Sequence, residues 1–159
     1  TMNVDPSAEQ LATITEACMD LVGHFGLEPK VALLSHSNFG TSNAPSAKKV
    51  RAAAEILRAS HSDIEIDGEM HVLSALNPAL RKTVYPQANL NGRANVLVMP
   101  NLDAANIAMG LIRSLTDGLL IGPFINGLAK PAHIVLPSVT SRGIFNMTAL
   151  TVTDIQHSK

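Results

Sequence analysis

The chain has 159 residues, of which 46% are hydrophobic and 16% charged, and its formal net charge at pH 7 is -1. This length and apolar content suit one ordinary domain, and the balanced charge predicts neither nucleic-acid nor membrane partners. A single cysteine, Cys18, excludes a disulfide framework and favours a reducing, cytoplasmic location. The start resembles no signal peptide, and no apolar run approaches the ~18 residues of a membrane span.

Helix-like and strand-like apolar patterns alternate along the chain. A helix is predicted over residues 5–26, with Asp5 as its N-cap, and others over 45–60, 72–76, 78–85, 102–115 and 144–154. Apolar runs predict strands at 31–34, 94–99, 119–121 and 134–136, and a further short strand at 64–66. Buried strands separated by helices indicate an α/β fold with three α/β/α layers and a mostly parallel sheet.

Residues 35–42, which read SHSNFGTS, follow the first predicted strand and precede a helix that starts with Pro45. Small hydroxyls, an amide and flexible backbone N–H groups at a helix start suit an anionic ligand. They equally suit a well-capped strand-to-helix connection, and both interpretations stay open. Ligands of parallel sheets bind at the carboxyl ends of strands, so residues 101–106 and 137–142 are further candidate segments. Asn101 is expected to cap a helix there.

Several other chemistries find little support. The six histidines have no metal-ligand spacing, and no dinucleotide fingerprint or phosphate-binding loop is present. Ser35 and Ser37 lack the glycines of a nucleophile elbow. Asp67-Gly68-Glu69 is expected to be a turn, whose two carboxylates form either an acid/base pair or a solvated surface.

Five segments together resemble the phosphate acetyl/butyryltransferase family. They are VALLSHSNFGTS, IDGEM, NGRANVLVMPNLDAANIA, IGPFINGLAKPAH and SRGIFNMTAL, and they cover roughly Val31 to Gln156. The resemblance implies an isocitrate/isopropylmalate dehydrogenase-like fold of two subdomains, with coenzyme A and acetyl phosphate bound between them. It also implies that residues 1–159 are one domain, the second subdomain plus the closing helix, and that the first subdomain lies outside the chain.

One departure from the family concerns the closing segment. Transferases of the family follow Ser-Arg-Gly with an acid that is proposed to deprotonate the coenzyme A thiol. Here Ser141-Arg142-Gly143 continues directly into Ile144-Phe145, without an acid. Because this thiol is mostly protonated at neutral pH, losing its proton acceptor should slow transfer strongly while affecting binding less. The shortened close is more similar to the carboxy-terminal domain of large bacterial NADP-dependent malic enzymes, and a start at Thr1 is expected for a piece of such a chain.

This second resemblance implies a non-catalytic regulatory and oligomerising domain that senses acetyl-CoA. The parent would convert malate to pyruvate by oxidative decarboxylation, with NADP and divalent metal bound in domains outside this chain. A fragment of an active phosphate acetyltransferase and an assembly module without a ligand remain alternatives. No catalytic residue and no metal site are expected within the chain, and its expected partners are acetyl-CoA and further copies of itself.

The residues expected to contact acetyl-CoA, coenzyme A or phosphate come from the three polar segments. Arg142 would supply the positive charge, because its planar fork donates paired hydrogen bonds to phosphate. Lys130 is a weaker candidate. The full set of expected contacts is Ser37, Asn38, Gly40, Thr41, Ser42, Asp103, Asn106, Ser141 and Arg142.

Overall fold

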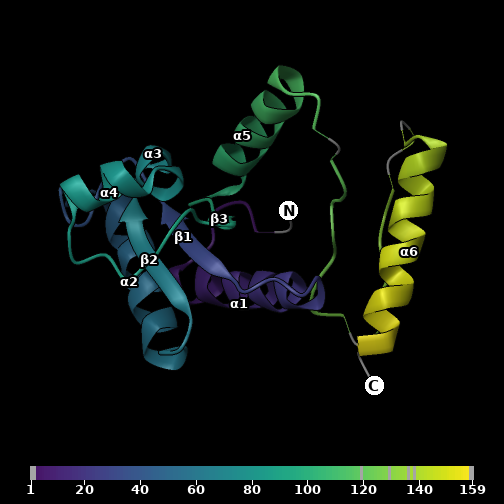
Figure 1. The fold of residues 1–159 in the computed structure, drawn as a ribbon, viewed down its shortest axis with the longest axis horizontal. Helices are drawn as coiled ribbons and strands as arrows, with labels where there is room; N and C mark the ends of the chain where they lie inside the picture. Colours follow the sequence, from purple (N-terminus) through teal and green to yellow (C-terminus); the bar gives the residue numbers. More distant parts are fainter. Residues whose placement is uncertain (1–2, 119, 129, 136, 138, 158–159) are drawn as a thin grey trace. The chain divides into compact units, whose positions relative to one another are not determined.

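A computed structural model describes residues 3–118, 120–128, 130–135, 137 and 139–157. The chain divides into two compact units, residues 1–109 and 110–159, and each is described by itself (Figure 1). The elements, in chain order, are α1 (Ala8–His24), β1 (Lys30–Leu34), α2 (Pro45–Ser60), β2 (Glu65–Met70), α3 (Val72–Leu76), α4 (Pro78–Val84), β3 (Val96–Val98), α5 (Leu102–Leu115) and α6 (Ser141–His157).

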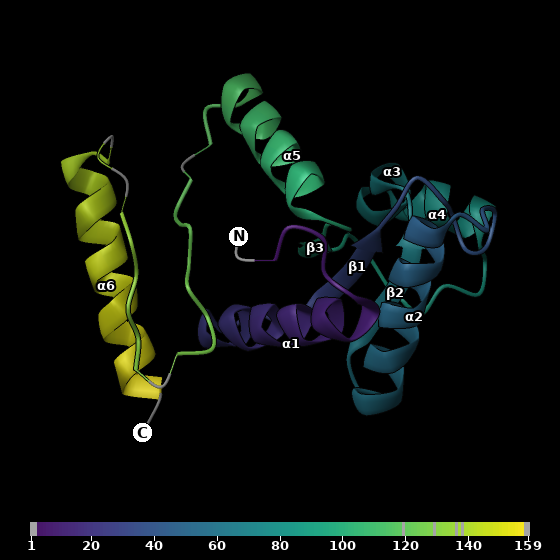
Figure 2. The same ribbon diagram turned by 180° about the vertical axis from the view of Figure 1, so that it is seen from behind.

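The first unit is built on a parallel sheet with the strand order β2-β1-β3. Alternate residues of β1 face opposite sides of this sheet. Val31 and Leu33 pack with α1 and α2 on one side, whereas Ala32 and Leu34 pack with α3 and the segment before β3 on the other. The helices α1 and α2 also contact each other, and both can be followed in Figures 1 and 2. The predicted α/β class is confirmed, with helices covering both faces of a parallel sheet.

The start of α1 differs from the prediction. Its N-cap is Ser7, whose hydroxyl accepts the Gln10 N–H while the Gln10 side chain accepts the Ser7 N–H. This capping box satisfies two backbone donors at once, which a cap at Asp5 would not do. The predicted N-cap at Asp5 is therefore wrong by two positions, and Asp5 instead forms an ion pair with Lys49 of α2.

Residues 67–69 also differ from the prediction. They form the middle of β2 rather than a turn, and both acids are buried. Gly68 makes this strand possible, because at its φ of +147° a Cβ would lie 2.7 Å from the Leu33 carbonyl oxygen of β1. Only glycine lets the two backbones approach so closely. The apolar pattern predicted a strand that ends at residue 66, because the acids at positions 67 and 69 interrupt it, but the strand continues to Met70.

The second unit contains the end of α5 and the whole of α6. The helix α6 starts at Ser141, three residues before its predicted start, so Ser141 and Arg142 belong to its first turn. The strands predicted at 119–121 and 134–136 are wrong for residues 120, 121, 134 and 135, which are irregular, while Leu119 and Leu136 lie outside the described residues. Apolar runs need a neighbouring backbone to form strands, and the described residues pair only β2 and β3 with β1. None of the described helices has both the length and the hydropathy to cross a bilayer.

Candidate functional site

The connection between β1 and α2 carries five of the predicted ligand contacts. It leaves the carboxyl end of β1 and folds back over β2. Ser37 is fully buried, and its hydroxyl donates to Glu69 Oε1 at 2.8 Å and accepts the Ser42 N–H at 2.9 Å. The Asn38 amide oxygen accepts the His71 N–H at 2.7 Å. The side chains of this connection therefore bond mainly to the protein itself.

The backbone N–H groups of residues 37–42 are all engaged as well. Their acceptors are three hydroxyls and one carbonyl of the same connection, and the carbonyl and carboxylate of Glu69. The pairs are Ser37 to Ser35 Oγ, Asn38 to Thr41 Oγ1, Phe39 to Glu69 O, Gly40 to Glu69 Oε1, Thr41 to Asn38 O and Ser42 to Ser37 Oγ. These six N–H groups, which one of the two open interpretations assigned to a ligand, hold the connection in one conformation.

Glu69 is the centre of this arrangement. Its side chain is 0% exposed, and Arg51 of α2 donates to both carboxylate oxygens, from Nε to Oε2 at 2.9 Å and from Nη2 to Oε1 at 2.8 Å. Burial raises the pKa of Glu69, but the hydrogen bonds from Arg51, the Gly40 N–H and Ser37 outweigh it and lower the pKa to about 2. The same hydrogen bond to Glu69 raises the pKa of Arg51. The carboxylate is therefore ionised and fully hydrogen-bonded.

The three acids of β2 share one pattern. Glu65, Asp67 and Glu69 lie at alternate positions, and each accepts a backbone N–H from a connection and pairs with a cation. The N–H donors are Asn91, Asn89 and Gly40, and the cations are Lys30, Arg58 and Arg51, respectively. Asp67 and Glu69 thus anchor backbone, which leaves neither placed as a general acid or base. Alternating acids could have signalled an edge strand, but the apolar pattern alone did not.

An open pocket of about 650 Å³ lies at the carboxyl ends of β1 and β3. It is lined by Ser35 and His36 after β1, by Ser46 and Lys49 of α2, and by Asn101 after β3. In the described part of the chain no side chain caps α2, whose N-cap is Ala44, and Pro45 and Ser46 at its start line this pocket, as does the acid Asp5. The place is where parallel sheets bind ligands.

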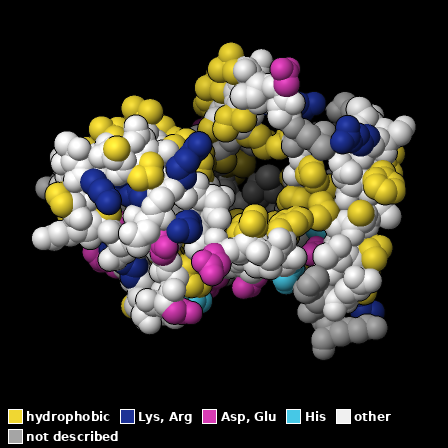
Figure 3. Space-filling model, in the orientation of Figure 1, with side chains coloured by type: hydrophobic (Ala, Val, Ile, Leu, Met, Phe, Trp, Pro, Cys, Tyr) yellow, Lys and Arg dark blue, Asp and Glu magenta, His cyan; other side chains and the backbone are white. Residues whose placement is uncertain are grey.

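The remaining predicted contacts of the first unit lie on α5. Asn101 caps this helix as expected, because its side chain accepts the Ala104 N–H at 2.9 Å. Asp103 and Asn106 are exposed on the first turns that follow. Farther along α5, apolar side chains are exposed too, and yellow covers the helix at the top of Figure 3. The exposed apolar residues of α5 are Ile107, Met109, Leu111, Ile112 and Leu115.

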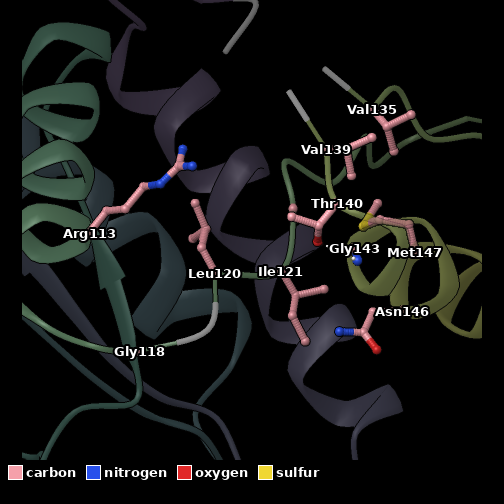
Figure 4. A pocket seen from close by; sticks show the side chains of 11 residues that line it. Arg113, Gly118, Leu120, Ile121, Val135, Val139, Thr140, Gly143, Asn146 and Met147 are labelled. Atoms are coloured by element: carbon pink, nitrogen blue, oxygen red, sulfur yellow. Dashed lines mark hydrogen bonds between the residues drawn. The ribbon is translucent and has the colours of Figure 1, made fainter. Parts of the chain in front are cut away.

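Ser141 and Arg142 belong to the second unit and are exposed at the start of α6. The residues that flank them in sequence, Thr140 and Gly143, line a pocket of about 270 Å³ together with Met147 (Figure 4). Thr140 Oγ1 accepts the Gly143 N–H at 3.1 Å, the dashed line of Figure 4. The predicted segment 137–142 also contains Ser138, which lies outside the described residues. The first turn of α6 carries no acidic side chain.

No group of three or more His, Cys, Asp or Glu side chains suited to a metal ion occurs among the described residues.

Comparison with known proteins identifies the family. The chain matches the family described as Phosphate acetyl/butaryl transferase over residues 1–152. It belongs to this family.

Named relatives add detail. The chain is 49% identical to the NAD-dependent malic enzyme of Rhizobium meliloti, over 98% of this chain and 20% of that protein. It is 47% identical to the NADP-dependent malic enzyme of Escherichia coli, over 98% of this chain and 21% of that protein. A phosphotransacetylase structure from Streptococcus pyogenes matches with a TM-score of 0.93 and 30% identity, over 99% of this chain and 48% of that one. The chain therefore spans about a fifth of these malic enzymes and about half of the phosphotransacetylase.

Proposed function

We propose that this chain is the transferase-like region of a bacterial malic enzyme and that it binds acetyl-CoA as an effector without transferring the acetyl group. The sequence supports a malic enzyme parent, because the chain is 49% and 47% identical to the two malic enzymes named above and 30% identical to the phosphotransacetylase. The parent would oxidise and decarboxylate malate to pyruvate. NADP, or the NAD that the name of the Rhizobium relative suggests, and a divalent metal would bind outside this chain.

The start of α6 carries the non-catalytic half of the proposal. Ser141 and Arg142 occupy its first turn, and the only acid on the helix is Asp154. Since a helix rises 1.5 Å per residue, Asp154 lies about 18 Å along the axis from Arg142, too far to take a proton beside it. Asp154 also pairs with His133, at 3.4 Å. On α6 itself, this arrangement keeps a cation for phosphate and places no carboxylate beside it as the base.

Binding without chemistry is sufficient for an effector domain. An effector needs only to bind one conformation of the parent better than another. Each unit offers its own candidate position for an anionic part of acetyl-CoA: the pocket at the carboxyl ends of β1 and β3 in the first unit, and the start of α6 with Arg142 in the second. Self-association and a cytoplasmic location complete the proposal.

The test uses the full-length protein and two assays on one sample. Calorimetry measures the Kd of acetyl-CoA, and a coupled assay measures acetyl phosphate formation from acetyl-CoA and phosphate. Acetyl-CoA binding that changes the rate of malate oxidation, without acetyl phosphate formation, would support the proposal. Acetyl phosphate formation would instead favour the alternative of an active transferase. If acetyl-CoA does not bind and no acetyl phosphate forms, assembly is the role that is left.

Arg142→Ala tests the assigned cation. The variant should raise the Kd of acetyl-CoA about tenfold or more, because a charge-assisted hydrogen bond to phosphate is lost. Arg93→Ala is the matched control, since Arg93 is also an exposed arginine but lies outside the predicted set. An unchanged Kd and an unchanged response of malate oxidation in Arg142→Ala would refute the assignment.

A further inference from the structure

Glu69 contacts the β1–α2 connection through both its backbone and its side chain. Its carbonyl accepts the Phe39 N–H, and its carboxylate accepts the Gly40 N–H and the Ser37 hydroxyl, all at 2.8 Å. Arg51 adds a third link, because its Nη2 donates to the Ser42 carbonyl at 2.9 Å as well as to Glu69. Two side chains thus reach both ends of residues 37–42.

The conformation that these contacts hold is an unfavourable one. Phe39 has a φ of +45° and Gly40 a φ of +92°, so two successive residues occupy the left-handed region. A bulky residue is strained there and persists only where its surroundings determine it. For Phe39 those surroundings are Glu69 and the ring of Tyr85, which stacks on the Phe39 ring with centroids 4.2 Å apart.

The connection also sets the shape of the pocket at the carboxyl ends of β1 and β3. Residues 35 and 36, just before it, and residues 45 and 46, just after it, line that pocket. Because the core holds β1 and α2 in place, loose residues 37–42 would affect only the ends of the two walls, residues 35–36 on one side and residues 45–46 on the other. A ligand would then have to order the connection itself, and that ordering lowers affinity.

We infer that Arg51 and Glu69 are positioning residues, which hold residues 37–42 so that this pocket is preformed for its ligand. The inference rests on the proposed function for the identity of the ligand, acetyl-CoA, and adds two residues that act on its site without contacting it. Neither side chain belongs to the two hydrophobic clusters of the unit. Their loss should therefore open the connection locally rather than unfold the sheet.

Glu69→Gln in the full-length protein is the decisive variant. The amide keeps the size of the side chain but replaces one acceptor oxygen with a donor, so either Arg51 Nε loses its acceptor, or Arg51 Nη2, Ser37 and Gly40 lose theirs together. Glu65→Gln is the matched control, because Glu65 lies on the same strand and accepts a backbone N–H but does not touch residues 37–42. Arg51→Lys is a second, milder variant that keeps the charge and loses the fork.

Two measurements decide the inference. Hydrogen exchange should rise at least tenfold in peptides covering residues 37–42 of Glu69→Gln, with β1 and α1 still protected, and calorimetry should show acetyl-CoA bound about tenfold more weakly. Glu65→Gln should change neither quantity more than twofold. Arg51→Lys should shift both in the direction of Glu69→Gln.

Three results would overturn part or all of the inference that Arg51 and Glu69 position residues 37–42 for ligand binding. Uniformly faster exchange through β1 and α1 would show a general structural role, and unchanged exchange of residues 37–42 would show that the pair does not hold them. Faster local exchange with an unchanged Kd would refute the effect on binding. If the wild-type protein binds no acetyl-CoA, the proposed function and the binding role fail, and the exchange result alone then decides whether the pair anchors the connection.

Discussion

Acid should destabilise the first unit in a manner that depends on Glu69. Burial raises the pKa of this carboxyl, but the hydrogen bonds from Arg51, Gly40 and Ser37 bring it from the ordinary 4.5 to about 2. At about 1.4 kcal/mol per pH unit, the difference between 4.5 and about 2 amounts to about 3 kcal/mol. Because the folded pKa is the lower one, this stabilisation is complete above about pH 4.5 and is lost progressively as the pH falls toward 2.

The assay compares urea unfolding of this chain and its Glu69→Gln variant from pH 7 to pH 2.5. Tyr85 is the only tyrosine and the chain has no tryptophan, so tyrosine fluorescence reports on the first unit. The free energy of unfolding of the wild type, minus that of the variant, should shrink by about 3 kcal/mol over this range. A difference that stays constant with pH would mean that Glu69 titrates alike in the folded and unfolded chain, which would refute the role given to its hydrogen bonds.

Two further substitutions probe stability by the same unfolding assay. Arg81→Met should lower the free energy of unfolding by about 3 kcal/mol, because the buried guanidinium donates to four backbone carbonyls. The control Lys82→Met changes an exposed side chain and should alter the free energy of unfolding by less than about 0.5 kcal/mol. A loss below about 1 kcal/mol in Arg81→Met would contradict the role given to its hydrogen bonds. Gly68→Ala should cost at least about 3 kcal/mol, since its Cβ would meet a backbone oxygen of β1 at 2.7 Å, while Gly23→Ala, with open space around it, should be neutral or stabilise α1 by up to about 1 kcal/mol. Equal effects of the two glycine substitutions would contradict the close approach at Gly68.

The helices of this chain could be predicted because their signals are local. A proline at the first position and an apolar stripe mark α2, and its observed bounds, Pro45–Ser60, are those expected from these signals. The strand β2 could not be predicted in full, since acids occupy every second position from Glu65 to Glu69. Their burial is favourable only with cations and N–H groups supplied from elsewhere in the chain, and one sequence does not reveal those long-range partners.

The sequence indicated where a pocket would lie but not how residues 35–42 are bonded. Polar residues after β1 and β3 indicated the carboxyl edge of the sheet, and a pocket lies there. The composition of residues 35–42 could not distinguish a ligand loop from a self-bonded connection, because Ser, Asn and Thr serve both purposes. The structure shows extensive self-bonding, whereas the contacts predicted to acetyl-CoA stay predictions.

A Ser37 variant can distinguish direct contact with acetyl-CoA from positioning of the site. Ser37 was predicted as a ligand contact, but it is fully buried and its hydroxyl bonds to Glu69. Suppose Ser37→Ala weakens acetyl-CoA binding only through the conformation of residues 37–42. Its effect should then largely disappear in a Glu69→Gln background, since the two residues share a 2.8 Å hydrogen bond and both substitutions act through the conformation of residues 37–42. Calorimetry on the two single variants and the double variant of the full-length protein measures this coupling. If the losses of binding free energy in the two single variants add up in the double variant, the Ser37 hydroxyl contacts the ligand independently of Glu69, because additivity is typical of uncoupled positions.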